Sequence, residues 1–252
     1  MKKDLTVSVV TVCLNSKNFI KGAIDSVIKQ KYSNIEYLII DGGSEDGTMD
    51  IIKNNEMHID YYISEPDKGI YNAMNKGISN STGDILFFLN SDDRFVDENV
   101  VDDIVKIFKD NPDVDLVYGD VILAYPDIQK RWIQHSSFSR KNLARGTISH
   151  QSIFVKRKIM DMTNGFSEKF KIVGDYVWLM ELAHSNINSM HVKRDITTVS
   201  TEGLSHTTEW ENERIIAMRK YYTPLEILLW RSMPRKAKSM ANSFKRKISR
   251  KL

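Results

Sequence analysis

The sequence predicts an α/β fold in which a mostly parallel, Rossmann-like sheet is followed by a mixed α+β half and by C-terminal helices. Two patterns lead to this prediction. Short β-branched runs alternate with helix-like spacing of apolar residues up to about residue 93, and the later apolar runs are shorter and less regular. The chain has 252 residues, of which 41% are hydrophobic and 27% charged, so it can bury a core of its own.

The first half is expected to hold four strands and three helices. Val7, Val9 and Val10 suit a buried strand, whereas Ile20 and Ile24 belong to a run with helical spacing. Strands that alternate with helices pair in parallel, so ligands should bind beyond the carboxyl ends of the strands. We expect strands at 6–13, 35–40, 59–63 and 85–89, and helices at 20–28, 46–54 and 70–79.

The second half is expected to be less regular, and no Pro/Gly/Ser-rich linker separates it from the first. We therefore treat the chain as one architecture with parts at 1–93, 94–205 and 206–252. Strands are predicted at 115–118, 121–124, 131–134 and 152–155, and helices at 97–109, from 175 in amphipathic form, and from 208 onward.

Cysteine content and hydropathy restrict the class of protein. Cys13 is the single cysteine, so no internal disulfide can form, and a reducing, cytoplasmic location is expected. No run approaches the roughly 20 apolar residues needed to cross a bilayer. A membrane-spanning protein is therefore not expected.

Charge is distributed unevenly along the chain. From Arg231 onward there are nine Lys/Arg and no Asp/Glu, which leaves 27 basic and 33 acidic residues in the body. An acidic body argues against nucleic acid as a partner. The basic tail carries an apolar stripe typical of a helix at an anionic membrane surface, and the alternative is that the stripe packs on the body or on a second subunit of a homo-oligomer. The stripe consists of Ala237, Met240, Ala241, Phe244 and Ile248.

Carboxylates follow two of the predicted strands directly. Asp41 comes after the second strand, and Asp92 and Asp93 come after the fourth. Each segment alone is also a common turn sequence. Together, at one edge of a parallel sheet, such side chains suit Mg²⁺ or Mn²⁺ bridged to phosphates. No glycine-rich dinucleotide or P-loop phosphate motif is present, so a metal would have to neutralise the phosphates.

Four segments, taken in order, make the sequence similar to a known family. They are Val7–Val12 with Asn15, Glu36–Ser44 followed by Asp46–Thr48, Glu65–Gly77, and Gly83–Asp93. The chain resembles the inverting glycosyltransferases of family 2, which have the GT-A fold. The resemblance is dense over the first hundred residues, and His150-Gln151 and Gly174-Asp175 extend it.

The resemblance implies a nucleotide-sugar site in residues 1–93. Asp41 would accept a hydrogen bond from the base, usually uracil. Asp92 matches the metal-binding aspartate of the DXD motif, whose first aspartate is replaced here by Asn90. The implied metal, Mn²⁺ or Mg²⁺, would be held by Asp92, Asp93 and His206. The implied nucleotide-binding residues are Thr11, Asn15, Asp41, Lys68, Asn90 and Asp92.

The resemblance also implies an acceptor site in residues 94–205. Asp175 matches the catalytic base, which removes the proton of the acceptor hydroxyl. The alternative is a purely structural aspartate that caps the helix. His150 and Gln151 match acceptor-side positions.

The function expected from these features is transfer of one sugar from a nucleoside diphosphate sugar, a UDP-hexose or UDP-N-acetylhexosamine, with inversion. Gln129-Lys130-Arg131-Trp132 is one residue short of the Q-x-x-R-W signature of processive relatives, and it precedes Asp175, so a nonprocessive enzyme is expected. The expected acceptor is a lipid-linked glycan of O-antigen or capsule synthesis, reached from the inner face of the cell membrane. The alternatives are a sugar nucleotidyltransferase and a non-enzymatic membrane-surface adaptor.

Overall fold

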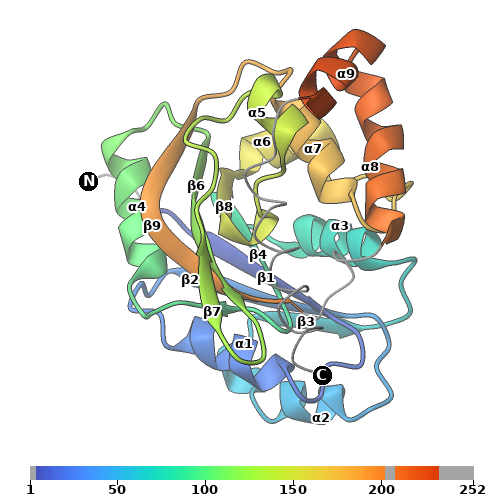
Figure 1. Cartoon of the computed structure of the whole chain (residues 1–252). Coiled ribbons are helices and arrows are strands. Elements are labelled where there is room, and N and C mark those ends of the chain that lie inside the picture. The colour runs from blue at the N-terminus through green and yellow to red at the C-terminus, as the bar shows by residue number, and fades with distance from the viewer. Residues whose placement is uncertain (1–3, 202–207, 233–252) are drawn as a thin grey trace.

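A single twisted sheet with helices on both faces organises the chain, and the computed structural model describes it over residues 4–201 and 208–232 (Figure 1). Across these residues the strands lie in the order β3 (Tyr61–Ser64), β2 (Ile35–Asp41), β1 (Val7–Cys13), β4 (Ile85–Asn90), β8 (Ile153–Lys156), β6 (Leu116–Ala124), β9 (Ser189–Ser200) and β5 (Arg94–Phe95), while β7 (Gln129–Trp132) pairs with β6.

The first four strands pair in parallel, as the sequence predicts. β1 lies between β2 and β4, and β3 pairs with β2. Every residue of β1 is buried, because neighbouring strands flank it and helices cover both faces. The parallel register sets Cys13 opposite Asp41 and Val12 opposite Asn90. The carboxyl ends of β1, β2 and β4 therefore share one edge.

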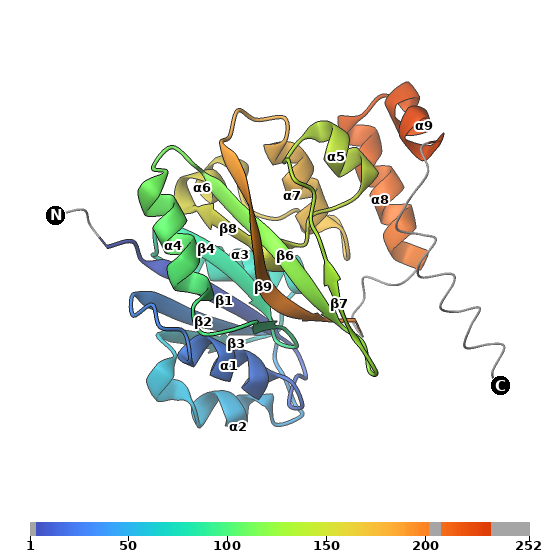
Figure 2. The ribbon, with the colours of Figure 1, turned by 60° about the vertical axis from the view of Figure 1, so that its left-hand side comes forward.

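Helices cover the sheet on two sides (Figure 2). Two hydrophobic clusters lie between these helices and the sheet. One face carries α1 (Ile20–Ile28), α2 (Thr48–Lys53) and α4 (Val100–Asp110). The other carries α3 (Ile70–Asn80), α5 (Arg140–Arg145), α6 (Arg157–Thr163) and α7 (Gly174–Leu182), followed by α8 (Thr208–Tyr221) and α9 (Pro224–Ser232). The 3-10 turns are η1 (Glu56–His58) and η2 (His150–Ser152).

The second half differs from the sequence prediction in its strands. The strands expected at 115–118 and 121–124 are one strand, β6, which contains a register shift between Tyr118 and Val121. β9 has twelve residues and was not predicted, because most of its positions are only half-buried and its apolar residues do not alternate cleanly. It is stabilised by parallel pairing with β6 and antiparallel pairing with β5.

The helices of this half also depart from expectation. α5 and α6 are short helices that apolar spacing did not predict. α7 begins near 175 as predicted, but its residues are buried almost all round, so it is an enclosed helix and not an amphipathic one. Within the described residues, no helix is long and apolar enough to cross a membrane.

α3 packs unusually close to the sheet. A Cβ atom on Gly77 would lie 2.3 Å from Cγ1 of Val10, so only glycine permits this approach. The close packing draws the start of α3, with Tyr71, toward the carboxyl ends of the central strands and toward α7, since the Tyr71 hydroxyl lies beside Asp175.

Candidate active site

The carboxyl edge of the parallel strands brings together the turns that follow β1, β2 and β4. The hydroxyls of Ser16 and Ser91 lie 2.8 Å apart and join the first turn to the third. The backbone N–H of Asn15 donates to Ser44 Oγ at 2.7 Å, and Asn15 Oδ1 accepts from Glu45 N at 3.0 Å. Asn15 adopts the left-handed backbone conformation, with φ of 50°. Through these two hydrogen bonds Asn15 links the turn after β1 to the turn after β2.

Asp41 lies in this edge with its carboxylate surrounded by donors from its own neighbourhood. Oδ2 accepts from the N–H groups of Gly43 and Ser44 and from the Ser64 hydroxyl, at 3.1, 2.8 and 2.6 Å. Oδ1 accepts from the hydroxyl of Ser44 and the thiol of Cys13. Burial raises the pKa of Asp41, but these hydrogen bonds outweigh it and leave the pKa below its ordinary value.

The last residue of β4 and the turn that follows it each contain an orphaned polar atom. Asn90 Oδ1 and Asp93 Oδ2 are buried without a hydrogen-bond partner in the described structure. Asp93 is 1% exposed, and its Oδ1 accepts from the N–H of Ser200 at 3.0 Å. Burial and the neighbouring Asp92 carboxylate raise the pKa of Asp93 to about 7. Two crowded carboxylates of this kind are an environment that a divalent cation would relieve.

The donor set suits Mg²⁺ or Mn²⁺ bound together with a diphosphate. Among residues 4–201 and 208–232, no group of three or more His, Cys, Asp or Glu side chains is arranged to hold an ion. These cations commonly use one or two carboxylates and take further oxygens from substrate phosphates. Asp92 and Asp93 meet that requirement. His206, the third predicted ligand, lies outside the described residues.

A second group of polar side chains centres on Asp175. Nδ1 of His150 lies 2.9 Å from Oδ2 of Asp175, and the hydroxyl of Tyr71 lies 2.9 Å from Oδ1. The Tyr71 hydroxyl also lies 2.7 Å from the carbonyl oxygen of Ile172. Burial raises the pKa of Asp175, but hydrogen bonds from His150 and Tyr71 outweigh this and lower it. Asp175 is therefore a carboxylate at neutral pH.

Asp175 is not the cap of its helix. The N-cap position of α7 is Val173, and Asp175 lies one residue inside the first turn. The N–H groups just before the helix donate instead to the carboxylate of Glu213 from α8. Glu213 of α8 therefore holds the segment that leads into α7.

η2 links the two groups of side chains. His150 contacts Asp175, while the side chain of Gln151 lies near Asp93 and partly offsets the rise in its pKa. Nε2 of His150 is buried and has no hydrogen-bond partner in the described part of the chain. The structure therefore brings His150, Gln151, Asp93 and Asp175 together, although they come from three separate segments.

Two predicted nucleotide-binding residues, Thr11 and Lys68, take no part in the hydrogen bonds that join these turns in the described structure. Thr11 is fully buried within β1, and its hydroxyl lies 3.1 Å from that of Tyr37, so it packs inside the fold. Lys68 is exposed in the loop before α3, and its backbone N–H donates to Asn72 Oδ1 at 3.2 Å. Tyr71, three residues further on, was not singled out from the sequence. Its place inside the family-like segment Glu65–Gly77 was the available signal.

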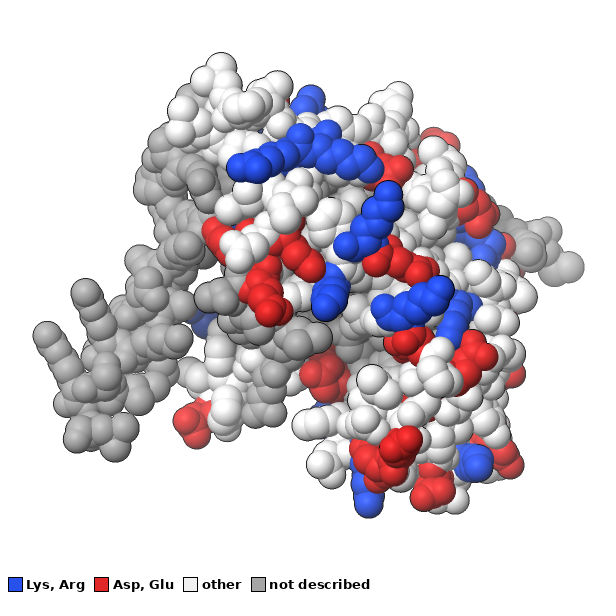
Figure 3. All heavy atoms as spheres, turned by 90° about the vertical axis from the view of Figure 1, so that its right-hand side faces the viewer, with Lys and Arg blue, Asp and Glu red and all other residues white. Residues whose placement is uncertain are grey.

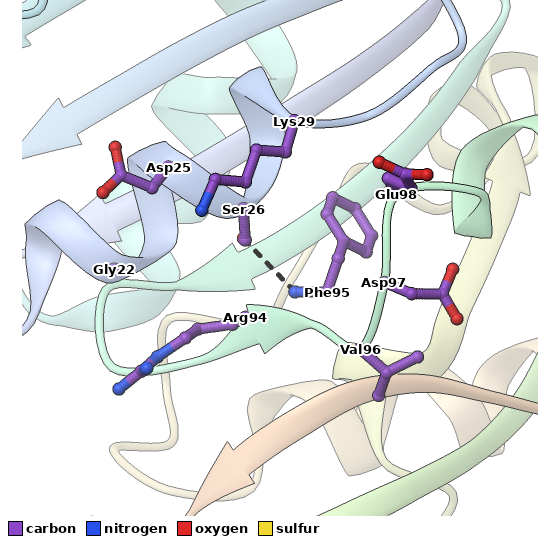
Figure 4. A pocket seen from close by; sticks show the side chains of 9 residues that line it. All are labelled: Gly22, Asp25, Ser26, Lys29, Arg94, Phe95, Val96, Asp97 and Glu98. Carbon is purple, nitrogen blue, oxygen red and sulfur yellow. Dashed lines mark hydrogen bonds between the residues drawn. The ribbon is translucent and has the colours of Figure 1, made fainter.

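A pocket of about 380 Å³ lies apart from these groups, between α1 and β5 (Figure 4). Within it the N–H of Phe95 donates to the Ser26 hydroxyl at 3.2 Å. The cations Lys29 and Arg94 line the pocket together with three carboxylates, so it favours neither an anionic nor a cationic ligand. Its lining contains none of the predicted site residues and consists of Gly22, Asp25, Ser26, Lys29, Arg94, Phe95, Val96, Asp97 and Glu98.

This mostly parallel sheet, with carboxylates at its carboxyl edge, has the GT-A fold. The model of glycosyl transferase family 2 matches residues 8–170, and the chain belongs to that family.

Relatives and solved structures agree with this assignment. An uncharacterized glycosyltransferase of Mycobacterium tuberculosis is 32% identical over 180 residues, which are 71% of this chain and 69% of the relative. A PGL/p-HBAD biosynthesis glycosyltransferase of Mycobacterium bovis is 28% identical over 172 residues, covering 67% of this chain and 66% of the relative.

Among solved structures, S. aureus TarS 1–349 in complex with UDP-GlcNAc has a TM-score of 0.71 at 16% identity, covering 90% of this chain and 69% of that one. A longer TarS chain is covered to 41%. The mannosyltransferase of Pyrobaculum calidifontis in complex with GDP-Man and Mn²⁺ has a TM-score of 0.66 at 15% identity. The match covers 92% of this chain and 70% of that one. At these identities the likeness shows the fold.

Proposed function

We propose that the protein transfers one sugar from a nucleoside diphosphate sugar to an acceptor hydroxyl, with inversion at the anomeric carbon. One observation carries the proposal: His150 of η2 contacts Asp175, and the adjacent Gln151 lies near Asp93 at the end of β4. The proposed diphosphate site and the proposed general base thus lie side by side. That arrangement suits displacement of a nucleotide by a hydroxyl.

Asp175 is proposed as the base. Its carboxylate takes the proton of the acceptor hydroxyl while the oxygen attacks the anomeric carbon, and the bond from that carbon to the diphosphate breaks. Attack from the face opposite the leaving group inverts the configuration. Since its pKa is low, Asp175 accepts the proton only as the hydroxyl becomes acidic during attack. His150 and Tyr71 hold the carboxylate in place.

Asp92 and Asp93 are proposed to hold the divalent cation, with Asn90 beside them at the end of β4. When bound, the cation would stabilise negative charge on the departing diphosphate. Asn15 keeps the neighbouring turns in place at the nucleotide end. The orphaned oxygens of Asn90 and Asp93 support a ligand at this position.

The donor is proposed to be a UDP-hexose or UDP-N-acetylhexosamine, and the acceptor a lipid-linked glycan. The similar TarS structure contains UDP-GlcNAc, and the M. bovis relative is named for PGL/p-HBAD biosynthesis. His150 and Gln151 are proposed to face the acceptor. The basic tail, proposed to hold the enzyme at the inner membrane face, lies at 233–252, outside the described residues. On the face seen in Figure 3, acidic and basic side chains are intermixed, unlike a nucleic-acid-binding surface.

The test is sugar transfer by Asp175→Asn compared with the wild type. We expect turnover to fall by about 10²- to 10⁴-fold, the usual contribution of a general base, while UDP affinity stays within a few-fold. Glu181→Gln, on the same helix, serves as the control. Release of UDP from UDP-Glc, UDP-Gal, UDP-GlcNAc or UDP-GalNAc identifies the donor. Consumption of pyrophosphate instead would indicate a nucleotidyltransferase, and full turnover by Asp175→Asn would remove it from the mechanism.

A further inference from the structure

α8 packs beside α7, the helix that carries Asp175 in its first turn (Figures 1 and 2). Two neighbouring residues of α8 make the contact. The guanidinium of Arg214 lies 5.3 Å from the ring centre of Tyr176, the residue after Asp175. Glu213 reaches the loop that enters α7. α8 lies beyond the residues that match the family model, so that match assigns no role to Glu213.

The Glu213 carboxylate accepts hydrogen bonds from three consecutive backbone N–H groups. Oε1 accepts from Lys171 N at 3.0 Å, and Oε2 accepts from Ile172 N and Val173 N at 2.8 and 3.3 Å. The N–H of Val173 and the carbonyl of Ile172 belong to one planar peptide unit and point in opposite directions. By holding this N–H on one side, Glu213 therefore directs the Ile172 carbonyl to the other side.

The Ile172 carbonyl oxygen in turn meets the hydroxyl of Tyr71. This hydroxyl lies 2.7 Å from the carbonyl oxygen and 2.9 Å from Oδ1 of Asp175. The Tyr71 ring also packs on the start of α7, since a Cβ atom on Gly174 would lie 2.6 Å from its Cδ2. A continuous path of hydrogen bonds thus runs from α8 through the Ile172 peptide and Tyr71 to Asp175.

The Tyr71 hydroxyl has one hydrogen and two acceptors within reach. Burial and the nearby Asp175 carboxylate raise the pKa of Tyr71 well above its ordinary value, so the hydroxyl keeps this hydrogen. While Asp175 is charged, the hydrogen bonds to it, because bonds to ionised acceptors are stronger. Once protonated, Asp175 is a weaker acceptor and the hydrogen turns to the Ile172 carbonyl. That carbonyl spares the buried hydroxyl the cost of having no partner.

We propose that Glu213 is a positioning residue for proton transfer to Asp175; this rests on the proposed function. It holds the Ile172 carbonyl where the Tyr71 hydroxyl needs a second acceptor. The proton of the acceptor hydroxyl moves to Asp175 while the acceptor oxygen bonds to the anomeric carbon, and the electron pair of the broken bond leaves with the diphosphate. Tyr71 neither gains nor loses a hydrogen. Glu213 therefore contributes to the chemical step and not to donor binding.

The experiment measures kcat and KM for nucleotide release by the full chain with Mn²⁺, water serving as the acceptor hydroxyl. The donors are UDP-Glc, UDP-Gal, UDP-GlcNAc, UDP-GalNAc and GDP-Man, and the one that the wild type cleaves fastest is kept. Glu213 is half-buried, and Glu213→Gln keeps the size of its side chain while removing one acceptor oxygen. We expect kcat to fall by about 3- to 10-fold, the effect of one neutral hydrogen bond, with KM for the donor within about twofold.

A double substitution separates positioning from folding. Tyr71→Phe removes the hydrogen for which the Ile172 carbonyl is held. Glu213→Gln in that background should therefore change kcat by less than about 1.5-fold, whereas a merely structural loss would lower kcat by the same factor in both backgrounds. Glu209→Gln changes an exposed acid on the same helix and should behave as the wild type does. Melting temperatures of all variants should stay within a few degrees of each other.

The outcomes distinguish this inference from the proposed function. Equal falls in kcat in the two backgrounds, or a rise in KM with kcat unchanged, would show that the inference is wrong and leave the proposed function standing. Wild-type kcat and KM in Glu213→Gln would do the same. If the wild type releases nucleotide from none of the five donors, or if Asp175→Asn keeps full turnover, the proposed function fails and the inference fails with it.

Discussion

His150 donates from Nδ1 to Oδ2 of Asp175 across 2.9 Å, and this bond joins η2 to the first turn of α7. It helps to hold the pKa of Asp175 below its ordinary value. His150→Ala should therefore raise that pKa, so that the acid limb of the profile of kcat/KM against pH moves to higher pH. His150 acts as a positioning residue for Asp175, and kcat of His150→Ala should fall by about tenfold or more.

The profile itself is the readout, because a merely structural loss would lower kcat/KM at every pH without moving the limb. Tyr71→Phe removes the other side-chain donor to Asp175 and should shift the limb in the same direction. An unchanged limb in both variants would show that these bonds do not set the acidity of the catalytic group.

The metal proposal predicts that Asp92→Asn loses Mn²⁺-dependent binding of the donor nucleotide. Asp92 is partly exposed, and its carboxylate accepts no hydrogen bond in the described part of the chain, so the fold should be unaffected. We expect affinity for Mn²⁺ in the presence of UDP to fall by at least about tenfold, the scale of losing a metal-site contact. Calorimetry with Glu98→Gln as the control measures it. Full sugar transfer in excess EDTA would overturn the role given to Asp92.

Asp41 is predicted to stabilise the fold, and the effect depends on pH in a defined direction. Asp41→Asn leaves buried donors facing an amide and should lower the free energy of unfolding by about 1–3 kcal/mol at pH 7. Because the folded pKa is lowered, the contribution of Asp41 is fully present above its ordinary pKa and is lost as the pH falls through the folded one. The difference in free energy of unfolding between Asp41→Asn and the wild type should therefore shrink below about pH 4.

Thermal unfolding at pH 7 and pH 3.5 checks this expectation. Glu45 is an exposed acid in the same turn, and Glu45→Gln should unfold at the same temperature as the wild type at both pH values. A difference for Asp41→Asn that grows on acidification would have the wrong sign for this explanation.

Two helix glycines are predicted to respond oppositely to alanine. Gly77→Ala places a methyl group against buried Val10 and should cost about 1–3 kcal/mol of stability. Gly22→Ala meets Arg94 Nε at 3.0 Å, and this exposed side chain can move away, so alanine should be neutral or stabilise α1 by about 0.5–1 kcal/mol. Denaturant unfolding of both variants compares them directly. Equal destabilisation would show that α1 packs as rigidly as α3.

Much of the donor half follows from local pattern. The β-branched run of β1, the alternation of strands with helices, and the acids at the ends of β2 and β4 were enough to predict a parallel sheet with its site at the carboxyl edge. These features are readable because short-range periodicity and parallel topology determine them. The second half was less predictable, since β9 depends on its neighbours β6 and β5 for order.

The sequence by itself determined the family, the parallel core and the residue types available for chemistry, because motifs and periodicity are properties of contiguous segments. Only the tertiary structure decided how those residues are used. Asp41 accepts bonds from Ser44 and Ser64, while Asp67 reaches the space above Gly42 from another loop. His150 meets Asp175 across 25 positions of chain. Contacts of this kind arise from packing between distant segments, and no local sequence pattern encodes them.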